Sequence, residues 1–425
     1  MKTTLGMVFV LALVGCGTVQ EDAGRPLKVL AVGNSFSFSL IHEWPQVAKA
    51  AGRPLDFVSL HIGGCTFETH VAKLSATNCP YGIAWDYQGD RTLAALPFQA
   101  KVKPVYDKKG EQIKYYAANS RDVLAGDDWD VITVQQGSPQ SWRWGSYRYA
   151  DELIAAIREL APRAEIRVQQ TWSYCTGDWR VRNPFTGGPG RWGVDLARMY
   201  DRLTMNYARL AAANGFKVIP TGVAVQDYRR LAGLTGYEGD VVGELHRTDK
   251  TWTGTDGDPI HLNKSGHYLQ ALVWTGALFG VDPRTVAYRP DYLDAAKAEM
   301  LREAAAQALA TGLPPPADPL AGQTYCANAD WLHRFAAAHG MRRVEPSADR
   351  IDTLLILVDG HVPTEKEALA AYVEDLCRKH PNAELVFVSA SRDVERVVGR
   401  YDVRFFRLPP DLPDDDLVTA FERWY

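Results

Sequence analysis

The sequence predicts an α/β protein with a parallel sheet, followed by a second, smaller α/β domain. From about residue 26, short apolar runs alternate with amphipathic stretches, as expected for strands joined by crossover helices. A proline-rich segment near residue 315 interrupts this pattern, which then resumes. With 425 residues the chain exceeds what one hydrophobic core usually serves, so two domains are expected.

The first 16 residues have the features of a lipoprotein signal peptide. Lys2 precedes an uncharged, mostly apolar stretch that is too short to span a bilayer. This stretch ends in Leu13-Val14-Gly15-Cys16, which resembles the bacterial lipobox. We therefore expect an exported protein, acylated at Cys16 and anchored to the membrane, facing the periplasm or the cell surface. The alternative is an ordinary signal peptide with an incidental cysteine.

Residues 25–311 are predicted to form the larger domain. Compact apolar or β-branched runs predict its strands, and apolar residues three and four apart predict its helices. Residues 66–129 follow neither pattern clearly. The expected strands are 27–32, 55–60, 130–135, 166–170 and 217–220, and the expected helices are 149–160, 196–213, 265–279 with Ser265 as N-cap, and 291–309.

Residues 312–325 are predicted to be a linker, and residues 326–425 a small α/β domain. The linker contains Gly312-Leu-Pro-Pro-Pro-Ala-Asp-Pro, whose prolines remove backbone donors. The small domain shows neither a CxxC pair nor a glycine-rich phosphate loop, and Asp359-Gly360-His361 is interpreted as a strand-to-helix turn. We expect a docking or glycan-contacting module. Its expected helices are 330–339, 365–378 and 415–424, and its strands 353–358, 384–389 and 403–408.

Composition argues against several functions. The net charge is only −4 and no run of Lys or Arg stands out, so nucleic acid is not expected as a partner. The cysteines after Cys16 lack the paired spacing of a zinc site, so no metal is expected. Cys65 and Cys79 either close a disulfide or remain free thiols.

A serine lies directly after the first predicted strand, in Gly33-Asn34-Ser35-Phe36-Ser37. Ligands of open parallel sheets bind outside the carboxyl ends of the strands, so Ser35 is a candidate nucleophile. Serine is also a preferred helix N-cap, and the motif alone fits both roles equally.

A second polar cluster, Asp258-Pro259-Ile260-His261, precedes a predicted helix. His261 could take the proton of a serine hydroxyl while Asp258 orients the imidazole. Taken alone, the cluster is also typical of a solvated turn.

Two candidate oxyanion elements follow the second and third strands, at Gly63-Gly64 and at Gln135-Gln136. A glycine N–H and a side-chain amide can together stabilise a tetrahedral oxyanion. The alternatives are a tight turn at the glycines and a polar strand end at Gln136.

Together these blocks resemble the SGNH (GDSL-like) hydrolases, in the branch whose serine block reads GNSFS, over about residues 27–285. The resemblance implies a flavodoxin-like three-layer α/β/α domain and a serine esterase without cofactor or metal. It assigns Ser35, His261 and Asp258 to catalysis, and Ser35, Gly64 and Gln136 to the oxyanion hole. Gln136 departs from the Asn of most members, which puts the third oxyanion donor in doubt.

The expected substrate is an acylated carbohydrate or another small ester. Aromatic side chains are frequent in the loops after the strands, and sugars stack on such faces. Asn34, Trp142 and Trp172 are the candidate substrate-binding residues. The alternative function is a non-catalytic, lipid-anchored glycan-binding protein with a decayed SGNH cleft. The loop aromatics are Trp85, Trp142, Trp144, Tyr147, Trp172, Tyr174, Trp179 and Trp192.

Overall fold

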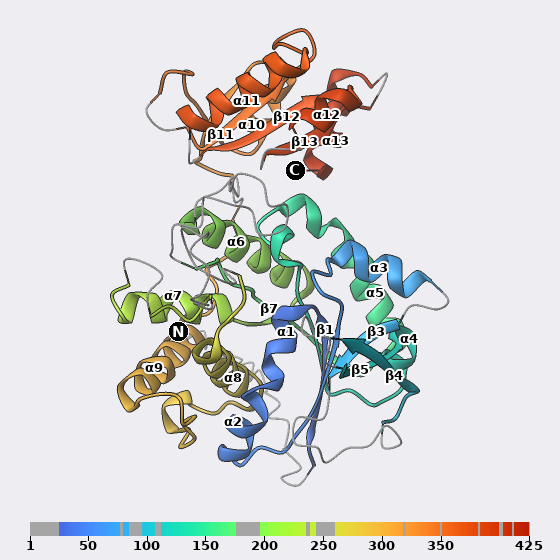
Figure 1. Ribbon diagram of the computed structural model, residues 1–425, viewed down its shortest axis with the longest axis vertical. Helices are drawn as coiled ribbons and strands as arrows, with labels where there is room; N and C mark the ends of the chain where they lie inside the picture. Colours follow the sequence, from blue (N-terminus) through green and yellow to red (C-terminus); the bar gives the residue numbers. More distant parts are fainter. Residues whose placement is uncertain are drawn as a thin grey trace, which may run out of the picture.

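The computed structural model contains two α/β units that follow one another along the chain (Figure 1). No helix among the described residues is both long enough and apolar enough to cross a membrane. The described residues are 25–76, 80–84, 96–106, 112–175, 196–234, 239–243, 260–317, 320–348, 351–380, 383–398, 403–409 and 412–424.

The first unit is built on an eight-stranded sheet with the order β4-β5-β3-β2-β1-β6-β7-β8. Its parallel part, β2-β1-β6-β7-β8, has the flavodoxin-like order, so the predicted fold is confirmed. β1 lies at the switch point, where Val29 pairs with Phe57 on one side and with Val131 on the other. These strands are β1 (Leu27–Gly33), β2 (Leu55–His61), β6 (Val131–Val134), β7 (Glu165–Gln169) and β8 (Lys217–Ile219).

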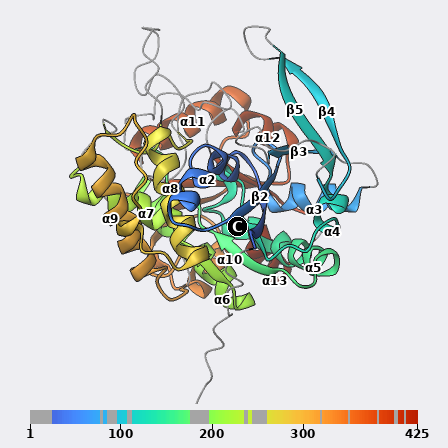
Figure 2. The same cartoon turned by 90° about the horizontal axis from the view of Figure 1, so that it is seen from below.

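Helices cover both faces of this sheet, which gives three layers (Figures 1 and 2). One group packs together beside β2 and β8: α2 (Trp44–Ala50), α7 (Thr221–Leu231), α8 (Lys264–Phe279) and α9 (Ala295–Thr311). The other group consists of α3 (Phe67–Ser75), α4 (Ser120–Ala125), α5 (Ala150–Leu160) and α6 (Leu196–Asn214). Between them β1 is almost wholly apolar and buried, as a strand covered on both faces requires.

An antiparallel extension widens the sheet where the sequence predicted no regular structure. β3 (Pro80–Ala84) pairs antiparallel with β2, and β5 (Gln112–Asn119) joins it to β4 (Ala100–Tyr106). Lysines at 101, 103 and 114 interrupt the apolar pattern of β4 and β5. β4 is an edge strand, which tolerates such charges, and β5 is its neighbour in the sheet, so a search for apolar runs overlooks this pair.

The cap of α8 differs from the predicted one. The helix begins at Lys264 rather than at Ser265, because the side chain of Asn263 accepts a hydrogen bond from the Gly266 N–H. The same Asn263 side chain donates to the carbonyls of Asp240 and Gly243. One asparagine thus caps α8 and joins the start of this helix to residues 240–243, the segment that pairs with the backbone of His261.

The second unit is a five-stranded parallel sheet with the order β10-β9-β11-β12-β13. Its first strand starts at Thr324, two residues inside the predicted linker. Two separate apolar cores flank the sheet, one under α10 and α13 and the other under α11 and α12. The strands are β9 (Thr324–Ala327), β10 (Arg342–Arg343), β11 (Thr353–Leu357), β12 (Glu384–Ser389) and β13 (Arg404–Arg407), and the helices α10 (Asp330–Ala338), α11 (Lys366–Lys379), α12 (Arg392–Val398) and α13 (Asp414–Trp424).

Asp359, at the carboxyl end of β11, has a structural role. Its carboxylate accepts hydrogen bonds from the Ser389 hydroxyl and from the Ala390 N–H, so it joins the ends of two neighbouring strands. This agrees with the interpretation of Asp359-Gly360-His361 as a turn.

Buried His70 should make stability depend on pH. Burial lowers the pKa of His70, on α3, to about 3, whereas an unfolded histidine has a pKa of about 6.5. Between these values only the unfolded chain binds the proton, so stability falls as the pH drops below about 6.5. We expect His70→Gln to reduce the slope of the free energy of unfolding against pH by up to about 1.4 kcal/mol per pH unit. Urea unfolding at pH 7, 6 and 5 measures this slope. If the two proteins lose stability equally between pH 7 and pH 5, the pKa of His70 is not lowered in the folded protein.

Candidate active site

Ser35 lies at the carboxyl end of β1, as the first residue of the short helix α1 (Ser35–Phe38). The turn before it requires a glycine, because a Cβ on Gly33 would lie 2.5 Å from the Ser37 Oγ and 3.2 Å from Gln135. Ser35 itself is partly exposed, while Asn34 and Phe36 on either side are buried. The backbone therefore presents one hydroxyl at the sheet edge and anchors its neighbours.

Asn34 is structural to this turn. Its side-chain carbonyl caps α1 by accepting from the Phe36 N–H and also accepts from the Gln135 amide at 2.6 Å. Its amide donates to the Cys65 carbonyl. Asn34 is 1% exposed, so the predicted substrate-binding residue instead connects the carboxyl ends of β1, β2 and β6.

His261 meets Ser35 across 226 residues of sequence. Its Nε2 lies 2.7 Å from the Ser35 Oγ, which is hydrogen-bond distance for a nucleophile and its general base. Phe36 packs edge-on against the imidazole, with ring centroids 5.5 Å apart. Asp258, the predicted orienter, lies outside the described residues. The structure thus brings together two of the three predicted triad members.

Backbone pairing fixes the segment that carries His261. The Gly243 N–H donates to the His261 carbonyl, and the Asn263 N–H donates to the Val241 carbonyl. On the other side, the Trp172 indole N–H donates to the Ile260 carbonyl at 2.8 Å. The base is therefore positioned from two directions.

A buried ion pair supports the segment 240–243 in turn. Arg229 on α7 contacts the carboxylate of Asp240 with both its Nε and its Nη2. Arg229 also donates to the hydroxyl of Ser173 and the carbonyls of Ser173 and Tyr174, in the loop after β7. The two side chains are 6% and 0% exposed, so the pair is well shielded from water. This pair could not be predicted from the sequence, since its members lie in no recognisable motif.

Gly64 lies in the loop after β2 and is exposed. Its φ of 66° is in the left-handed region that glycine adopts without strain. Asn34 holds this loop through the carbonyl of the next residue, Cys65. The predicted oxyanion glycine thus belongs to a loop that is tied directly to the serine turn.

Gln136 does not present its amide to the sheet edge. Its Nε2 donates to both the carbonyl and the hydroxyl of Ser146, and its Oε1 accepts from the N–H groups of Phe67 and Gly137. These four bonds use the full capacity of a primary amide. In this structure Gln136 therefore joins three loops instead of supplying the predicted oxyanion donor.

Gln136→Met should reveal this structural role. Methionine leaves the buried N–H groups of Phe67 and Gly137 without their acceptor, so we expect the free energy of unfolding to fall by at least about 2 kcal/mol. The ester kcat should fall by much less than the roughly hundredfold loss of an oxyanion donor. Urea unfolding and steady-state kinetics measure the two effects. A hundredfold lower kcat at unchanged stability would instead show that Gln136 acts as an oxyanion donor.

The two predicted substrate-binding tryptophans are both buried. Trp172 stacks on Phe36 with centroids 4.1 Å apart and is 1% exposed, so it supports the serine and histidine segments. Trp142 is 4% exposed and lies near the second α/β unit, beneath the Arg143 guanidinium. The structure brings neither ring to an open surface beside Ser35. Trp85, Trp179 and Trp192 lie outside the described residues.

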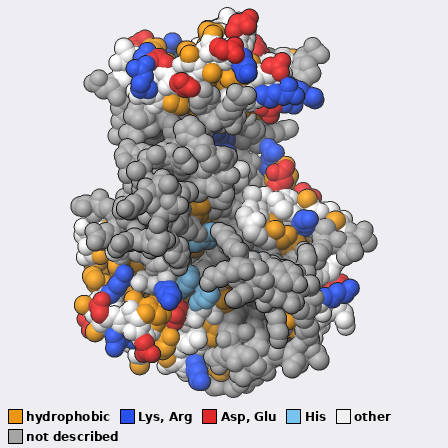
Figure 3. Space-filling view, in the orientation of Figure 1, with side chains coloured by type: hydrophobic (Ala, Val, Ile, Leu, Met, Phe, Trp, Pro, Cys, Tyr) orange, Lys and Arg blue, Asp and Glu red, His pale blue; other side chains and the backbone are white. Residues whose placement is uncertain are grey.

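Histidine side chains gather near the middle of the face shown in Figure 3. His42 and His267 stack with centroids 4.7 Å apart, and His267 lies close enough to His261 for their charges to interact. Burial, together with the neighbouring His42, lowers the pKa of His267 to about 3, and burial lowers the pKa of His61 to about 4. His61 and His267 are therefore neutral near pH 7, and His267 adds no positive charge beside the base. That these histidines lie close together in space could not be predicted from the sequence.

The remaining predicted features concern cysteines and metals. Cys65 is a buried free thiol whose pKa burial raises to about 12, so at Cys65 the structure has the free thiol and not the disulfide. Cys16 and Cys79 lie outside the described residues. Across the described ranges, no group of three or more His, Cys, Asp or Glu side chains could hold a metal ion.

Comparisons with known proteins agree with this architecture. The model of the DUF4886 family, a domain of unknown function, matches residues 106–308. A DUF4886 family protein from Bacteroides uniformis is 26% identical with a TM-score of 0.50, over 67% of this chain and 95% of the other. No curated protein matches the chain.

Solved structures similar to this chain also include SGNH hydrolases. A protein from Slackia heliotrinireducens assigned to that class is 15% identical with a TM-score of 0.34, over 60% of this chain and 100% of its own. A family 3 carbohydrate esterase from Clostridium thermocellum is 12% identical with a TM-score of 0.30, over 60% of this chain and 96% of its own. What the present chain does is inferred below from its own site.

Proposed function

We propose that this protein is a serine esterase that removes acyl groups, most simply acetyl, from a carbohydrate. The observation that carries the proposal is the 2.7 Å contact between the Ser35 Oγ and the His261 Nε2 at the carboxyl edge of a flavodoxin-like sheet. The choice of a carbohydrate rests on the expected export and on the aromatic composition of the loops, and not on the positions of Trp142 and Trp172, which are buried.

In the proposed reaction, the Ser35 Oγ attacks the ester carbonyl carbon while His261 takes its proton. A tetrahedral oxyanion forms, for which the N–H groups of Ser35 and Gly64 are the proposed donors. Collapse breaks the bond to the alcohol, which leaves with the proton from His261. Water, deprotonated by His261, then attacks the acyl-enzyme and releases the carboxylic acid and free Ser35. Asp258 is the proposed orienter of His261.

Acetate release from acetylated xylan tests the proposal, using the protein without residues 1–16. We expect release by this protein and none above background by Ser35→Ala. Removal of acetate by both proteins alike would contradict it, and so would release by neither protein from xylan or from acetylated polygalacturonate. Acetylated phospholipid and p-nitrophenyl acetate serve as comparison substrates. Hydrolysis of these two alone would support the esterase activity and contradict a carbohydrate substrate.

A second candidate is a non-catalytic glycan-binding protein anchored at the membrane through Cys16. The engagement of the Gln136 amide by Ser146 favours it, since the third oxyanion donor is then missing. A fluorophosphonate probe separates the two functions, because it labels only a serine that a base activates. Labelling that disappears in Ser35→Ala supports the esterase, and no labelling of either protein supports the binding protein.

A further inference from the structure

A cavity of about 200 Å³ lies between the first α/β unit and the second. The first unit supplies the start of α3, the end of β6 and the turns between Ser138 and Tyr149, and the second unit supplies Arg404 from β13. An engineered protein cavity of about 150 Å³ holds benzene, so this one is large enough for a single six-membered ring.

Positive charge dominates the described residues that line this cavity. Arg143, Arg148 and Arg404 face it together with one carboxylate, that of Glu68. Glu68 accepts a hydrogen bond from the Tyr149 hydroxyl, which lies on the same wall. The neutral lining is polar, with the side chains of Gln140 and Ser146 and the N-cap of α3. Such a lining suits a hydrophilic anion rather than an apolar group.

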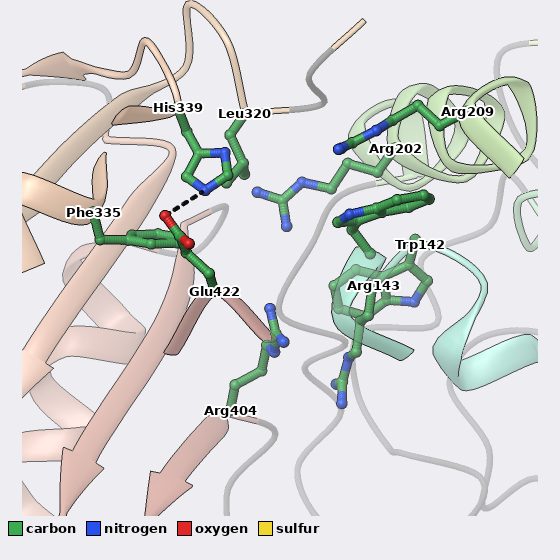
Figure 4. Close-up of a pocket in the computed structure, with 10 residues that line it drawn as sticks. Trp142, Arg143, Arg202, Arg209, Leu320, Phe335, His339, Arg404 and Glu422 are labelled. Carbon is green, nitrogen blue, oxygen red and sulfur yellow. Dashed lines mark ion pairs between the residues drawn. The ribbon is translucent and has the colours of Figure 1, made fainter. Parts of the chain in front are cut away.

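Two aromatic rings orient the arginines of the first unit. The Arg143 guanidinium lies 4.7 Å from the Trp142 ring centroid, and that of Arg148 lies 4.8 Å from the Tyr149 ring. Stacking uses the face of a guanidinium and not its N–H edges, and at one of these edges Arg148 donates to the Tyr149 hydroxyl. Figure 4 shows a neighbouring pocket that shares Arg143 and Arg404 with this cavity. The two arginines extend from opposite walls into the same gap, with Arg202 and Arg209 on one side and the carboxylate of Glu422 on the wall of the second unit. An anion between the walls would be attracted from both sides.

A loop links the cavity to the proposed catalytic residues, although neither Ser35 nor His261 lines it. Thr66 and Gln136 line it, and Thr66 is two residues after Gly64. The intervening Cys65 accepts the hydrogen bond from Asn34, the neighbour of Ser35. One loop thus connects the serine turn to the wall of the cavity.

We propose that this cavity binds an acidic sugar unit, through its carboxylate or sulfate, and that the second α/β unit contributes Arg404 to the site. This inference rests on the proposed function for the choice of a glycan, whereas the preference for an anion rests on the arginines alone. It gives the C-terminal unit a definite role as one wall of a binding site. The substrate class would then be an acylated acidic polysaccharide.

Calorimetric titration with trigalacturonate, beside neutral galactotriose, tests this proposal in the protein without residues 1–16. All proteins carry Ser35→Ala, so binding is read without turnover and independently of esterase activity. We expect trigalacturonate to bind and galactotriose not to. Arg148→Gln and Arg404→Gln should each raise the Kd at least tenfold, because each removes a charged hydrogen-bond donor.

Arg407→Gln is the matched control, since Arg407 lies on the same strand as Arg404 but is exposed and paired with Glu395. Its Kd should be unchanged. Arg148 is also exposed, so its substitution tests the site even where Arg404→Gln fails to fold. Equal binding of the two trisaccharides, no binding of either, or an unchanged Kd in Arg148→Gln would overturn the site. A folded Arg404→Gln protein with an unchanged Kd would overturn the role of the second unit.

Discussion

Ser35→Ala and His261→Ala are each expected to lower kcat/KM for p-nitrophenyl acetate by about 10⁴-fold or more. Either substitution removes one half of the 2.7 Å contact, without which the hydroxyl has no base to take its proton. The two residues act as one unit, so the double variant should be about as inactive as either single variant. Initial rates at saturating and limiting ester give kcat and kcat/KM separately.

Ser37→Ala is the matched control for these variants. Ser37 lies in the same short helix, but its hydroxyl is buried and donates to the Asn34 carbonyl. It should change kcat/KM by far less than Ser35→Ala. Equal losses at Ser35 and Ser37 would show that the turn is merely sensitive to substitution, and activity remaining in His261→Ala would remove the histidine from the mechanism.

Arg229→Met is expected to lower the free energy of unfolding by about 3–5 kcal/mol. The substitution leaves the carboxylate of Asp240 buried without its cation, and breaking a buried pair in this way is among the most destabilising single changes. Urea unfolding followed by tryptophan fluorescence measures the loss. We also expect a lower kcat in the folded protein, because segment 240–243 holds the His261 backbone.

The neighbouring Arg230→Met provides the comparison. Arg230 is 62% exposed and pairs with Asp227 at 3.1 Å, so its loss should cost less than about 1 kcal/mol. A similar small loss at Arg229 would mean that the buried pair contributes little to the fold.

The sequence predicted the parallel core well because its strands are short, apolar and followed by helices. β1 and β2 are of this kind, and each lies within one residue of its predicted bounds. The hairpin of β4 and β5 was overlooked because alternating lysines hide its pattern. Local composition therefore sufficed where both faces of a strand are buried, and failed where an edge strand borders water.

For the site, position was more informative than residue type. Ser35 could be proposed because it follows a strand end, and His261 because it stands three residues after Asp258 and just before a predicted helix. The role of Gln136 could not be foreseen, because it depends on Ser146 turning back toward it from a loop. Trp172 was predicted as a sugar platform from its ring alone, whereas packing on Phe36 decides its actual position.

The separation of Ser35 and His261 also has a consequence for how the molecule becomes active. Ser35 follows the first strand, whereas His261 comes after the last strand of the first sheet, so their contact spans 226 residues. Contacts of such long sequence separation form late, because the entropy of closing the intervening chain must be overcome first. A partly folded chain can therefore have a complete β1 turn and still be inert toward esters. Hydrolysis should begin only when the whole first unit has closed, which makes the appearance of activity a measure of completed folding.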